Sequence, residues 1–413
     1  MIRLRRAGAM ALVLYLFVIP FSKAAVEILF FILLPLWILG WHRWPFSGEG
    51  LRQIPPVHRK GFFLLTLYTA VCLLSVAFSN DLELSLRGFI GKTLEYSMLF
   101  IIAADLIDQP RVSRNAVRAL LAAAVLVMLH GFIQEWTIHT APFPGEALDP
   151  ILGRKMDYVR MVGPYENPND LATFLMVVGL IVTAWVAAHE ILLHLPILLL
   201  LVGGLLWTQS RGAILGFFSG LCLLGAIHHG KKEIRRGILL AIMACAAFFL
   251  LFSRRHFYEM LTLSDSASRE RSEMWRTAWR MILDRPIQGH GLNTFMANYS
   301  HYASNPASQP AYAHNCFLQI TAETGLVGLA TFLLFLAGLG AFTWKALKVS
   351  DRELSSEDQP TRILLIGLAA ALLAFLVQSF LDTNLYALRQ AALFWTLAGM
   401  TLGISSRFLR ARG

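Results

Sequence analysis

The chain has 413 residues, of which 56% are hydrophobic and 15% charged, and its 36 Lys and Arg against 26 Asp and Glu give a net charge of +10. Soluble domains carry about 25% charged residues, so this composition, with a mean hydropathy of +0.57, excludes a soluble globular protein. It indicates a polytopic helical membrane protein. The positions of so many cations in so apolar a chain then need an explanation.

Twelve apolar stretches are long enough, at about 20 residues each, to cross the hydrocarbon core of a bilayer as α-helices. In chain order they cover residues 7–22, 24–41, 61–79, 88–106, 115–137, 170–188, 190–206, 211–229, 236–253, 316–344, 362–382 and 389–406. We therefore predict an all-α polytopic membrane protein with about 12 transmembrane helices. No repeat or low-complexity tract interrupts it, so residues 1–413 are treated as a single membrane domain.

The distribution of Lys and Arg predicts the orientation, because cytoplasmic loops carry the excess of cations. With the N-terminus inside, more than half of the 36 cations fall on the cytoplasmic side, in both termini and in the loops near 42–60, 108–118, 230–236 and 345–362. Both termini are therefore expected in the cytoplasm. The opposite side then holds a loop at 138–169 and a longer one at 254–315, which we expect to form a helical extracytoplasmic cap.

Several outer cations stand where topology does not require them, at the ends of predicted helices: Arg87, Lys92, Arg211 and Arg389. Snorkelling toward lipid headgroups would explain Lys92 and Arg389 equally well. For Arg211 a ligand is favoured over snorkelling, because Gly212 and Gly216 thin the helix surface beside it and leave room for another group.

The long outer loop contains an amphipathic pattern that predicts a helix from Arg269 to Arg285. The predicted apolar face comprises Met274, Trp275, Ala278, Trp279 and Ile282. Arg269, Arg276 and Arg280 share the opposite, solvated face with Glu273. Arg271 instead lies in the middle of the apolar face, so it must either pair with a buried carboxylate or point into a site that holds an anion.

Arginine suits an anion site because its planar guanidinium donates two hydrogen bonds to a phosphate and stays charged at any relevant pH. Several arginines at the outer membrane face predict a phosphate or diphosphate ligand, such as a lipid-linked diphosphate. The outer segments contain no DxD, HExxH or clustered His/Asp pattern. We therefore expect no metal and no cofactor, and expect the arginines to neutralise a leaving group themselves.

His314 stands in the most informative setting of the twelve histidines. It precedes the stretch from Cys316, and Gly325 and Gly328 follow after nine further residues. A helix N-terminus disfavours a charged imidazole, so a neutral ring that can accept a proton from a hydroxyl is expected. The two glycines would let a neighbouring helix approach closely. The alternative is that His314 is a helix cap or a bonded core residue; His290 and His301 are expected to be surface or loop residues.

Four elements in the same order resemble those of bacterial O-antigen ligases and related polysaccharide polymerases, a superfamily of membrane glycosyltransferases. They are Asn167-Pro168-Asn169 before a helix, Ser210-Arg211-Gly212, Arg271-x-x-x-Trp275 with Pro286–Gly291 after it, and His314-Asn315 followed by Gly325-x-x-Gly328. With twelve predicted spans, they cover most of the chain. The first also has a structural explanation, because Asn167 as N-cap and Pro168 at the first position start a helix unaided.

The resemblance implies a metal-independent, inverting transferase of lipopolysaccharide biosynthesis in the bacterial inner membrane. Such enzymes move O-antigen polysaccharide from undecaprenyl diphosphate to a sugar hydroxyl of lipid A-core at the periplasmic face. It implies that His314 is the general base and that Arg211 and Arg271 hold the diphosphate. Further candidates for contacting that anion are Arg87, Lys92, Arg269, Arg276 and Arg389.

Three alternatives remain open at this stage. A polymerase would use a second lipid-linked glycan as acceptor, and a protein O-oligosaccharyltransferase would use a serine of a protein. From another class, a transporter of lipid-linked glycans also suits twelve spans. No internal repeat of two halves supports that reading, however, and the ionisable residues cluster at the outer face rather than at mid-membrane.

Overall fold

A computed structural model describes residues 2–40, 54–140, 149, 151–152, 160–188, 191–227, 266–304, 311–349, 355 and 358–410. Every regular element in these ranges is a helix. The elements are α1 (Ile2–Val18), α2 (Lys23–Gly40), α4 (Pro56–Ala77), α5 (Leu82–Gly88), η1 (Phe89–Leu94), α6 (Glu95–Leu106), α7 (Pro110–Thr140), α8 (Pro168–Ala188), α9 (Ile191–Trp207), α10 (Arg211–Ile227), α13 (Ser266–Asp284), α14 (Phe295–Tyr302), α15 (Cys316–Leu347), α16 (Gln359–Gln378) and α17 (Leu388–Arg410).

Seven of these helices are long and apolar enough to cross a membrane: α2, α4, α7, α8, α15, α16 and α17. Residues 195–207 in α9 and all of α10 form shorter apolar helices. The predicted all-α, polytopic membrane fold is thus confirmed. The predicted span at 236–253 lies outside the described residues, and every other predicted span overlaps a described helix.

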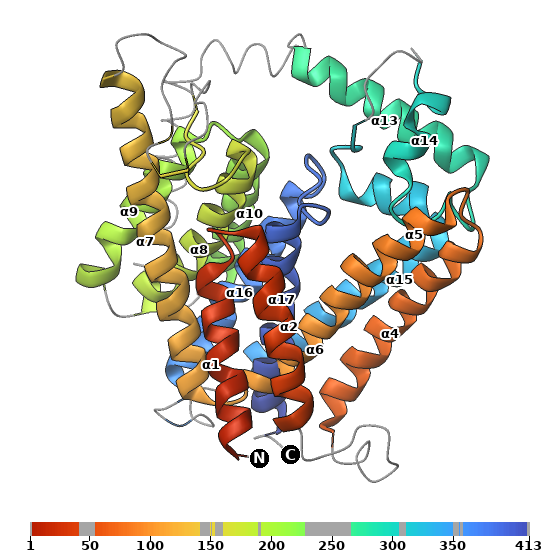
Figure 1. Cartoon of the computed structure of the whole chain (residues 1–413). Helices are drawn as coiled ribbons and strands as arrows, with labels where there is room; N and C mark the ends of the chain where they lie inside the picture. Colours follow the sequence, from red (N-terminus) through yellow and green to blue (C-terminus); the bar gives the residue numbers. More distant parts are fainter. Residues whose placement is uncertain are drawn as a thin grey trace.

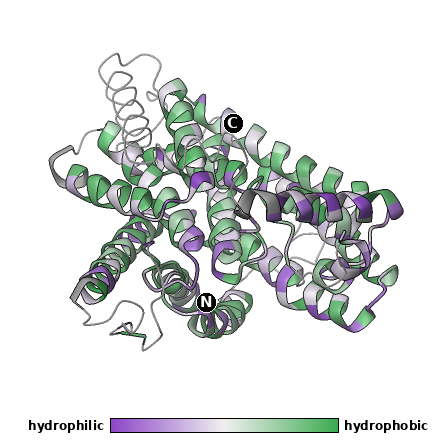
Figure 2. Cartoon of the chain, turned by 90° about the horizontal axis from the view of Figure 1, so that it is seen from above, coloured by the Kyte–Doolittle hydropathy of each residue, from purple (hydrophilic) through white to green (hydrophobic). Residues whose placement is uncertain are grey.

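The helices form a bundle whose two chain ends lie together, while α13 and α14 lie at the opposite end (Figure 1). Hydrophobic residues cover most of the bundle, and hydrophilic ones stand out on the helices nearest the viewer from above (Figure 2). Helix α17 is the central element, because nearly all its side chains are buried and it packs against α6, α15 and α16. Gly399 and Gly403 make the contact with α6 possible, since any Cβ there would collide with the carbonyls of Phe100 and Ala104.

Helices α10 and α16 approach each other through a glycine face. A Cβ on Gly216 would lie 2.6 Å from the carbonyl oxygen of Ala374, and one on Gly220 would lie 3.1 Å from that of Ala370. The prediction of free room beside Arg211 is therefore wrong, because α16 fills the space. The close contact instead sets the start of α10 beside the turn that follows α16, since Gly212 faces Gln378 and Leu381.

Helix α15 breaks at Gly325, where φ is 70° and ψ is −179°. The segment 286–291 crosses it there, and its backbone amides at His290 and Gly291 donate to the carbonyls of Ala322 and Glu323, at 3.0 and 2.9 Å. The expected close neighbour of Gly325 is thus an irregular segment rather than a helix. Gly328 faces the side chain of Thr324 in its own helix, so no neighbouring element approaches it.

The cap has a small hydrophobic core of its own, made by α13, α14 and the first turns of α15. Ala278 and Ile282 are buried in it as predicted, but Trp279 is 55% exposed and Met281 takes the buried place. The prediction was wrong for these two residues, because it assumed one regular apolar face. Helix α13 packs against both α14 and α15, so its buried face is shifted toward Met281.

Candidate functional site

Arg160 joins two of the sequence elements described above, Asn167-Pro168-Asn169 and the turn before Ser210-Arg211-Gly212. Its Nε donates to the carbonyl oxygen of Thr208 at 2.6 Å, and its Nη2 donates to Oδ1 of Asn169 at 3.1 Å. The first partner closes α9 and the second lies in the first turn of α8. Arg160 therefore holds the loop before α8 against the turn between α9 and α10.

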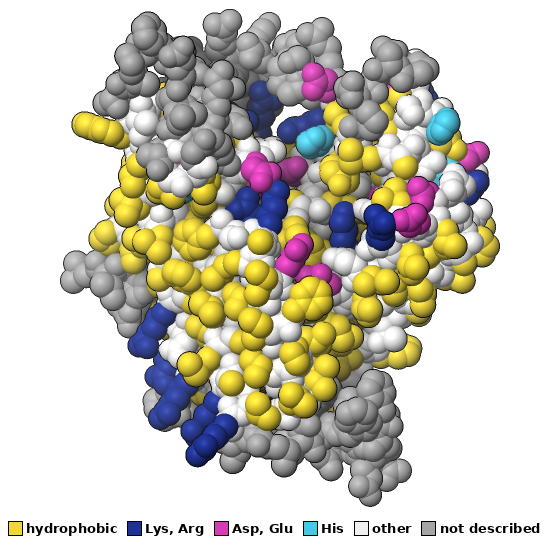
Figure 3. All heavy atoms as spheres, viewed as in Figure 1, with side chains coloured by type: hydrophobic (Ala, Val, Ile, Leu, Met, Phe, Trp, Pro, Cys, Tyr) yellow, Lys and Arg dark blue, Asp and Glu magenta, His cyan; other side chains and the backbone are white. Residues whose placement is uncertain are grey.

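Arg160 is also the centre of a cluster of charges. Burial lowers the pKa of its guanidinium, the nearby positive charges of Arg271 and Arg211 lower it further, and Asp382 raises it. Two arginines and one carboxylate from separate parts of the chain are thus near enough to Arg160 for their charges to act on it. Figure 3 shows basic and acidic side chains gathered around a hollow in the upper half of the molecule, above a belt of hydrophobic surface.

The turn between α9 and α10 fixes the position of Arg211. Gln209 takes a positive φ of 52°, and the carbonyl of Ser210 accepts from the amide of Ile214 at 2.9 Å, which begins α10. Arg211 is the first residue of that helix and is half-buried. Arg271 in α13 is half-buried too, and among the described residues no carboxylate forms an ion pair with it, which leaves the anion-site interpretation of this residue standing.

His314 lies directly before α15 and is not the residue that caps it. The cap is Asn315, whose side chain accepts from the amides of Phe317 and Leu318, both at 3.0 Å. Nδ1 of His314 is shielded from solvent and stands 3.5 Å from Oδ1 of Asp382, while 31% of the side chain is exposed. The backbone φ of 46° turns His314 out of the helical path.

The turn that carries Asp382 is tied to the start of α15. Cys316 donates its amide to the carbonyl of Ser379 at 2.8 Å and its thiol to the carbonyl of Asp382 at 3.2 Å. The amide of Thr383 donates to Oδ1 of Asp382 at 2.8 Å. The carboxylate of Asp382 thus lies beside Nδ1 of His314 without a hydrogen bond between them, and part of the imidazole stays exposed.

The Asn-Pro-Asn element has the structural role that its sequence suggested. The amide of Asn169 donates to Oδ1 of Asn167 at 2.8 Å, and Pro168 is the first residue of α8. Asn169 in addition binds Arg160, so the helix start also positions one member of the cation cluster.

Arg389 is buried and is used to hold the fold together. Its Nη1 donates to the carbonyls of Pro20 and Pro164, at 2.9 and 3.0 Å, and its guanidinium lies 4.2 Å from the ring centre of Tyr165. Snorkelling to the headgroups is thus wrong for this residue, and the structure does not bring it into the cluster around Arg160.

Lys92 belongs to a second, internal polar cluster. Its Nζ donates to Oδ1 of Asn293 at 2.8 Å and lies 5.9 Å from the ring centre of Tyr386. The buried carboxylate of Glu323 accepts from the amide of Asn293 at 2.9 Å and from the hydroxyl of Tyr386 at 3.2 Å. Lys92 and Glu323 thus compensate each other's charge inside the protein, and snorkelling does not describe Lys92 either.

The remaining predicted cations lie elsewhere. Arg87 is 77% exposed and pairs with Glu83 on α5, and Arg276 is 70% exposed and lies 3.8 Å from Glu273 on α13. The side chain of Arg269 lies outside the described residues. Of the predicted site residues whose side chains are described, the structure brings together His314, Arg211 and Arg271.

Sequence reasoning missed Arg160 and Asp382 as members of the site. Arg160 is a cation in a predicted outer loop shortly before the Asn-Pro-Asn element, and Asp382 is an acidic residue in a short turn predicted on the same side. Both signals were present in the sequence but were unspecific. His290 lies in an irregular segment, as one of its two expected settings had it, but it is not a surface residue: it is fully buried and lies 3.0 Å from the carbonyl of Met281.

These features define a multi-pass membrane protein with a cluster of cations at one end of the helix bundle. Comparison with known proteins shows what the chain resembles. Residues 196–333, which contain Arg211, Arg271 and His314, match the family described as O-Antigen ligase. The teichuronic acid biosynthesis protein TuaE of Bacillus subtilis is 27% identical over 279 residues, 63% of this chain and 54% of the relative. A protein of Rickettsia conorii named as a polysaccharide ligase is 23% identical over 319 residues, 70% of each chain. The chain thus spans about half the length of the first relative.

Proposed function

We propose that this protein is a glycosyltransferase that transfers O-antigen polysaccharide from undecaprenyl diphosphate to a sugar hydroxyl of lipid A-core. In this proposal the reaction occurs at the periplasmic face of the bacterial inner membrane, in lipopolysaccharide biosynthesis. The observation that carries it is the cluster of Arg160, Arg211 and Arg271 beside the pair of His314 and Asp382. The similarity of residues 196–333 to the family described as O-Antigen ligase supports the same reaction class.

The proposed mechanism begins with His314, which takes the proton from the acceptor hydroxyl. The oxygen attacks the anomeric carbon on the side opposite the diphosphate, so the new glycosidic bond forms with inversion as the bond from carbon to the phosphate oxygen breaks. Asp382, 3.5 Å from Nδ1, stabilises the imidazolium that results. Undecaprenyl diphosphate leaves with one additional negative charge.

The arginines meet that negative charge without needing a metal or cofactor. Arg211 and Arg271 are the residues proposed to bind the diphosphate, and Arg160 is added because its charge lies with theirs. Arg160 already uses Nε and Nη2 on Thr208 and Asn169, so it is held in place before a ligand arrives. Such preorganised cations stabilise developing charge more effectively than flexible ones.

The proposal is tested with purified protein in nanodiscs, a lipid-linked glycan donor, lipid A-core and EDTA. His314→Ala is expected to lower the transfer rate by about 10²–10⁴-fold while donor binding is kept. The matched control is His301→Ala, because His301 is exposed on α14 and no described contact links it to Asp382. Transfer that requires added metal, or a full rate in His314→Ala, would contradict the mechanism.

The identity of the acceptor needs an experiment of its own. A relative named for teichuronic acid biosynthesis suggests that the superfamily acts on more than one polysaccharide. Incubation with the lipid-linked donor alone would reveal a polymerase by longer lipid-linked products, and a protein acceptor would reveal an O-oligosaccharyltransferase. A transporter would translocate the donor in vesicles and would tolerate His314→Ala.

A further inference from the structure

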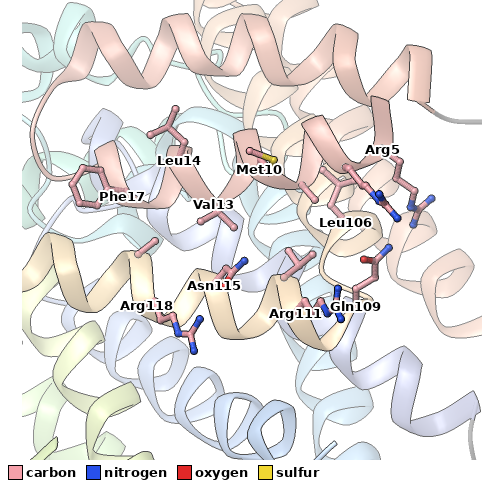
Figure 4. Close-up of a pocket in the computed structure, with 14 residues that line it drawn as sticks. Arg5, Met10, Val13, Leu14, Phe17, Leu106, Gln109, Arg111, Asn115 and Arg118 are labelled. Carbon is pink, nitrogen blue, oxygen red and sulfur yellow. The ribbon is translucent and has the colours of Figure 1, made fainter. Parts of the chain in front are cut away.

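A groove of about 830 Å³ runs between α1 and α7, at the end of the bundle where both termini lie. Figure 4 shows residues from the two helices, and from the turn between α6 and α7, facing this groove. It lies at the opposite end of the bundle from α13 and α14, and none of the residues that line it belongs to the cluster around Arg160. The groove is therefore a candidate binding site separate from that cluster.

One part of the groove is strongly basic. Arg5 and Arg6 reach it from α1, and Arg111 and Arg118 reach it from α7, while its lining contains no carboxylate. Arg5 is neutralised by Asp105 at 3.3 Å. No ion pair joins the other three arginines to any residue in the described part of the chain, and all three are exposed. Arg111 and Arg118 are seven residues apart, so they lie on one face of α7 about 10 Å from each other.

The other part of the groove is apolar. Met10, Val13, Leu14 and Phe17 follow each other along α1, away from Arg5 at the start of that helix, and Arg118 faces this strip from α7 (Figure 4). Met10 is 73% exposed and Leu14 is 49% exposed, as expected for side chains that face lipid rather than protein. A basic region continued by an exposed apolar strip matches a glycerophospholipid, whose phosphate joins directly to acyl chains.

We propose that this groove binds one anionic phospholipid from the leaflet at the end that holds both termini. The phosphate lies among Arg6, Arg111 and Arg118, and the acyl chains lie over Met10 and Leu14. An anionic headgroup is favoured over a zwitterionic one, because three unpaired cations repel an ammonium group and no carboxylate in the lining would attract it. The bound lipid would join α1 to α7 across the groove.

Native mass spectrometry of the full chain, released from mild detergent and titrated with defined lipids, tests this proposal. Dioleoyl phosphatidylglycerol is expected to bind at least tenfold more tightly than dioleoyl phosphatidylcholine, and inorganic phosphate alone is expected not to compete. Equal binding of the two lipids, or displacement by inorganic phosphate, would overturn the proposal.

Variants locate the lipid. Arg111→Gln with Arg118→Gln is expected to weaken phosphatidylglycerol binding about tenfold. Arg114→Gln is the matched control: Arg114 is exposed on the same helix but does not line the groove, so its variant should bind as the unchanged protein does. If the double variant fails to fold, each single variant is expected to lose about threefold. Unchanged binding in the groove variants, or an equal loss in the control, would place the lipid elsewhere.

Discussion

The substitution Gly325→Ala tests whether the break in α15 is held by the segment that crosses it. At Gly325 φ is 70° and ψ is −179°, a combination nearly confined to glycine, and holding another residue there costs about 1–3 kcal/mol. An added Cβ would overlap the carbonyl oxygen of Ile287, and such overpacking costs about 1–3 kcal/mol more. The shift needed to relieve the overlap also strains the hydrogen bond from the amide of Leu326 to the carbonyl of Pro286.

The combined cost of about 2–6 kcal/mol can be compared with a melting curve. At about 2.1 cal/mol/K for each of 413 residues, this corresponds to a midpoint lowered by roughly 2–7 °C. The assay is thermal unfolding of the detergent-solubilised protein, followed by tryptophan fluorescence. Transfer activity should fall as well, because the turn before α15 carries His314.

Gly340→Ala is the control for this change, because it makes the same substitution in the same helix. No atom lies within 4 Å of a Cβ added there, and alanine in a helix interior is favoured over glycine by about 1 kcal/mol. Its melting midpoint should therefore stay constant or rise slightly. If Gly325→Ala melts with the unchanged protein, or if the control falls equally, the crossing segment does not hold the break.

Three further predictions concern other parts of the molecule. Asp382→Asn should lower the transfer rate at least about tenfold while donor binding is kept, because His314 loses its orienting carboxylate; the ratio of kcat to donor KM and the pH profile check this. Arg389→Met should lower the free energy of unfolding by about 2–6 kcal/mol, because two buried carbonyls lose their donor. Arg276→Gln, which removes an exposed ion pair, should change it by less than about 1 kcal/mol. Melting midpoints of the two variants test this difference. Burial lowers the pKa of His290 below its usual value of about 6.5, so the unfolded chain takes up a proton at this residue before the folded chain does. The free energy of unfolding is therefore unaffected above that pH and decreases as the pH falls below it. The melting midpoint should decline from pH 8 to pH 5, and His290→Gln should reduce the decline.

The membrane-spanning helices could be predicted from sequence because each depends on a local property, an apolar stretch of about 20 residues. Helix α8 is an example, since Asn167 and Pro168 mark its start in the sequence and in the structure. Break points were harder to foresee. Gly325 was expected inside one continuous helix, because nothing in the local sequence indicates that amides about 32 residues earlier bind the carbonyls of Ala322 and Glu323.

The chemistry of each outer cation could not be predicted in the same way. Arg389 and Lys92 both stand near helix starts, a pattern that suits lipid headgroups and anionic ligands alike. Their actual partners are carbonyls of Pro20 and Pro164 in one case and Asn293 in the other, all far away in the sequence. Only packing in three dimensions separates these residues from Arg211, which remains in the cluster.

The order of the cluster along the chain has a consequence for biogenesis. Arg160, Arg211, Arg271 and His314 all precede Asp382, which lies in the turn just before the central helix α17. Because α17 packs against α6, α15 and α16, the earlier helices cannot adopt their final spacing until it has entered the membrane. In the proposed mechanism, a chain still being synthesised thus carries its cations before the carboxylate beside the proposed base His314 is in place, so transfer would begin only after the last helix is inserted.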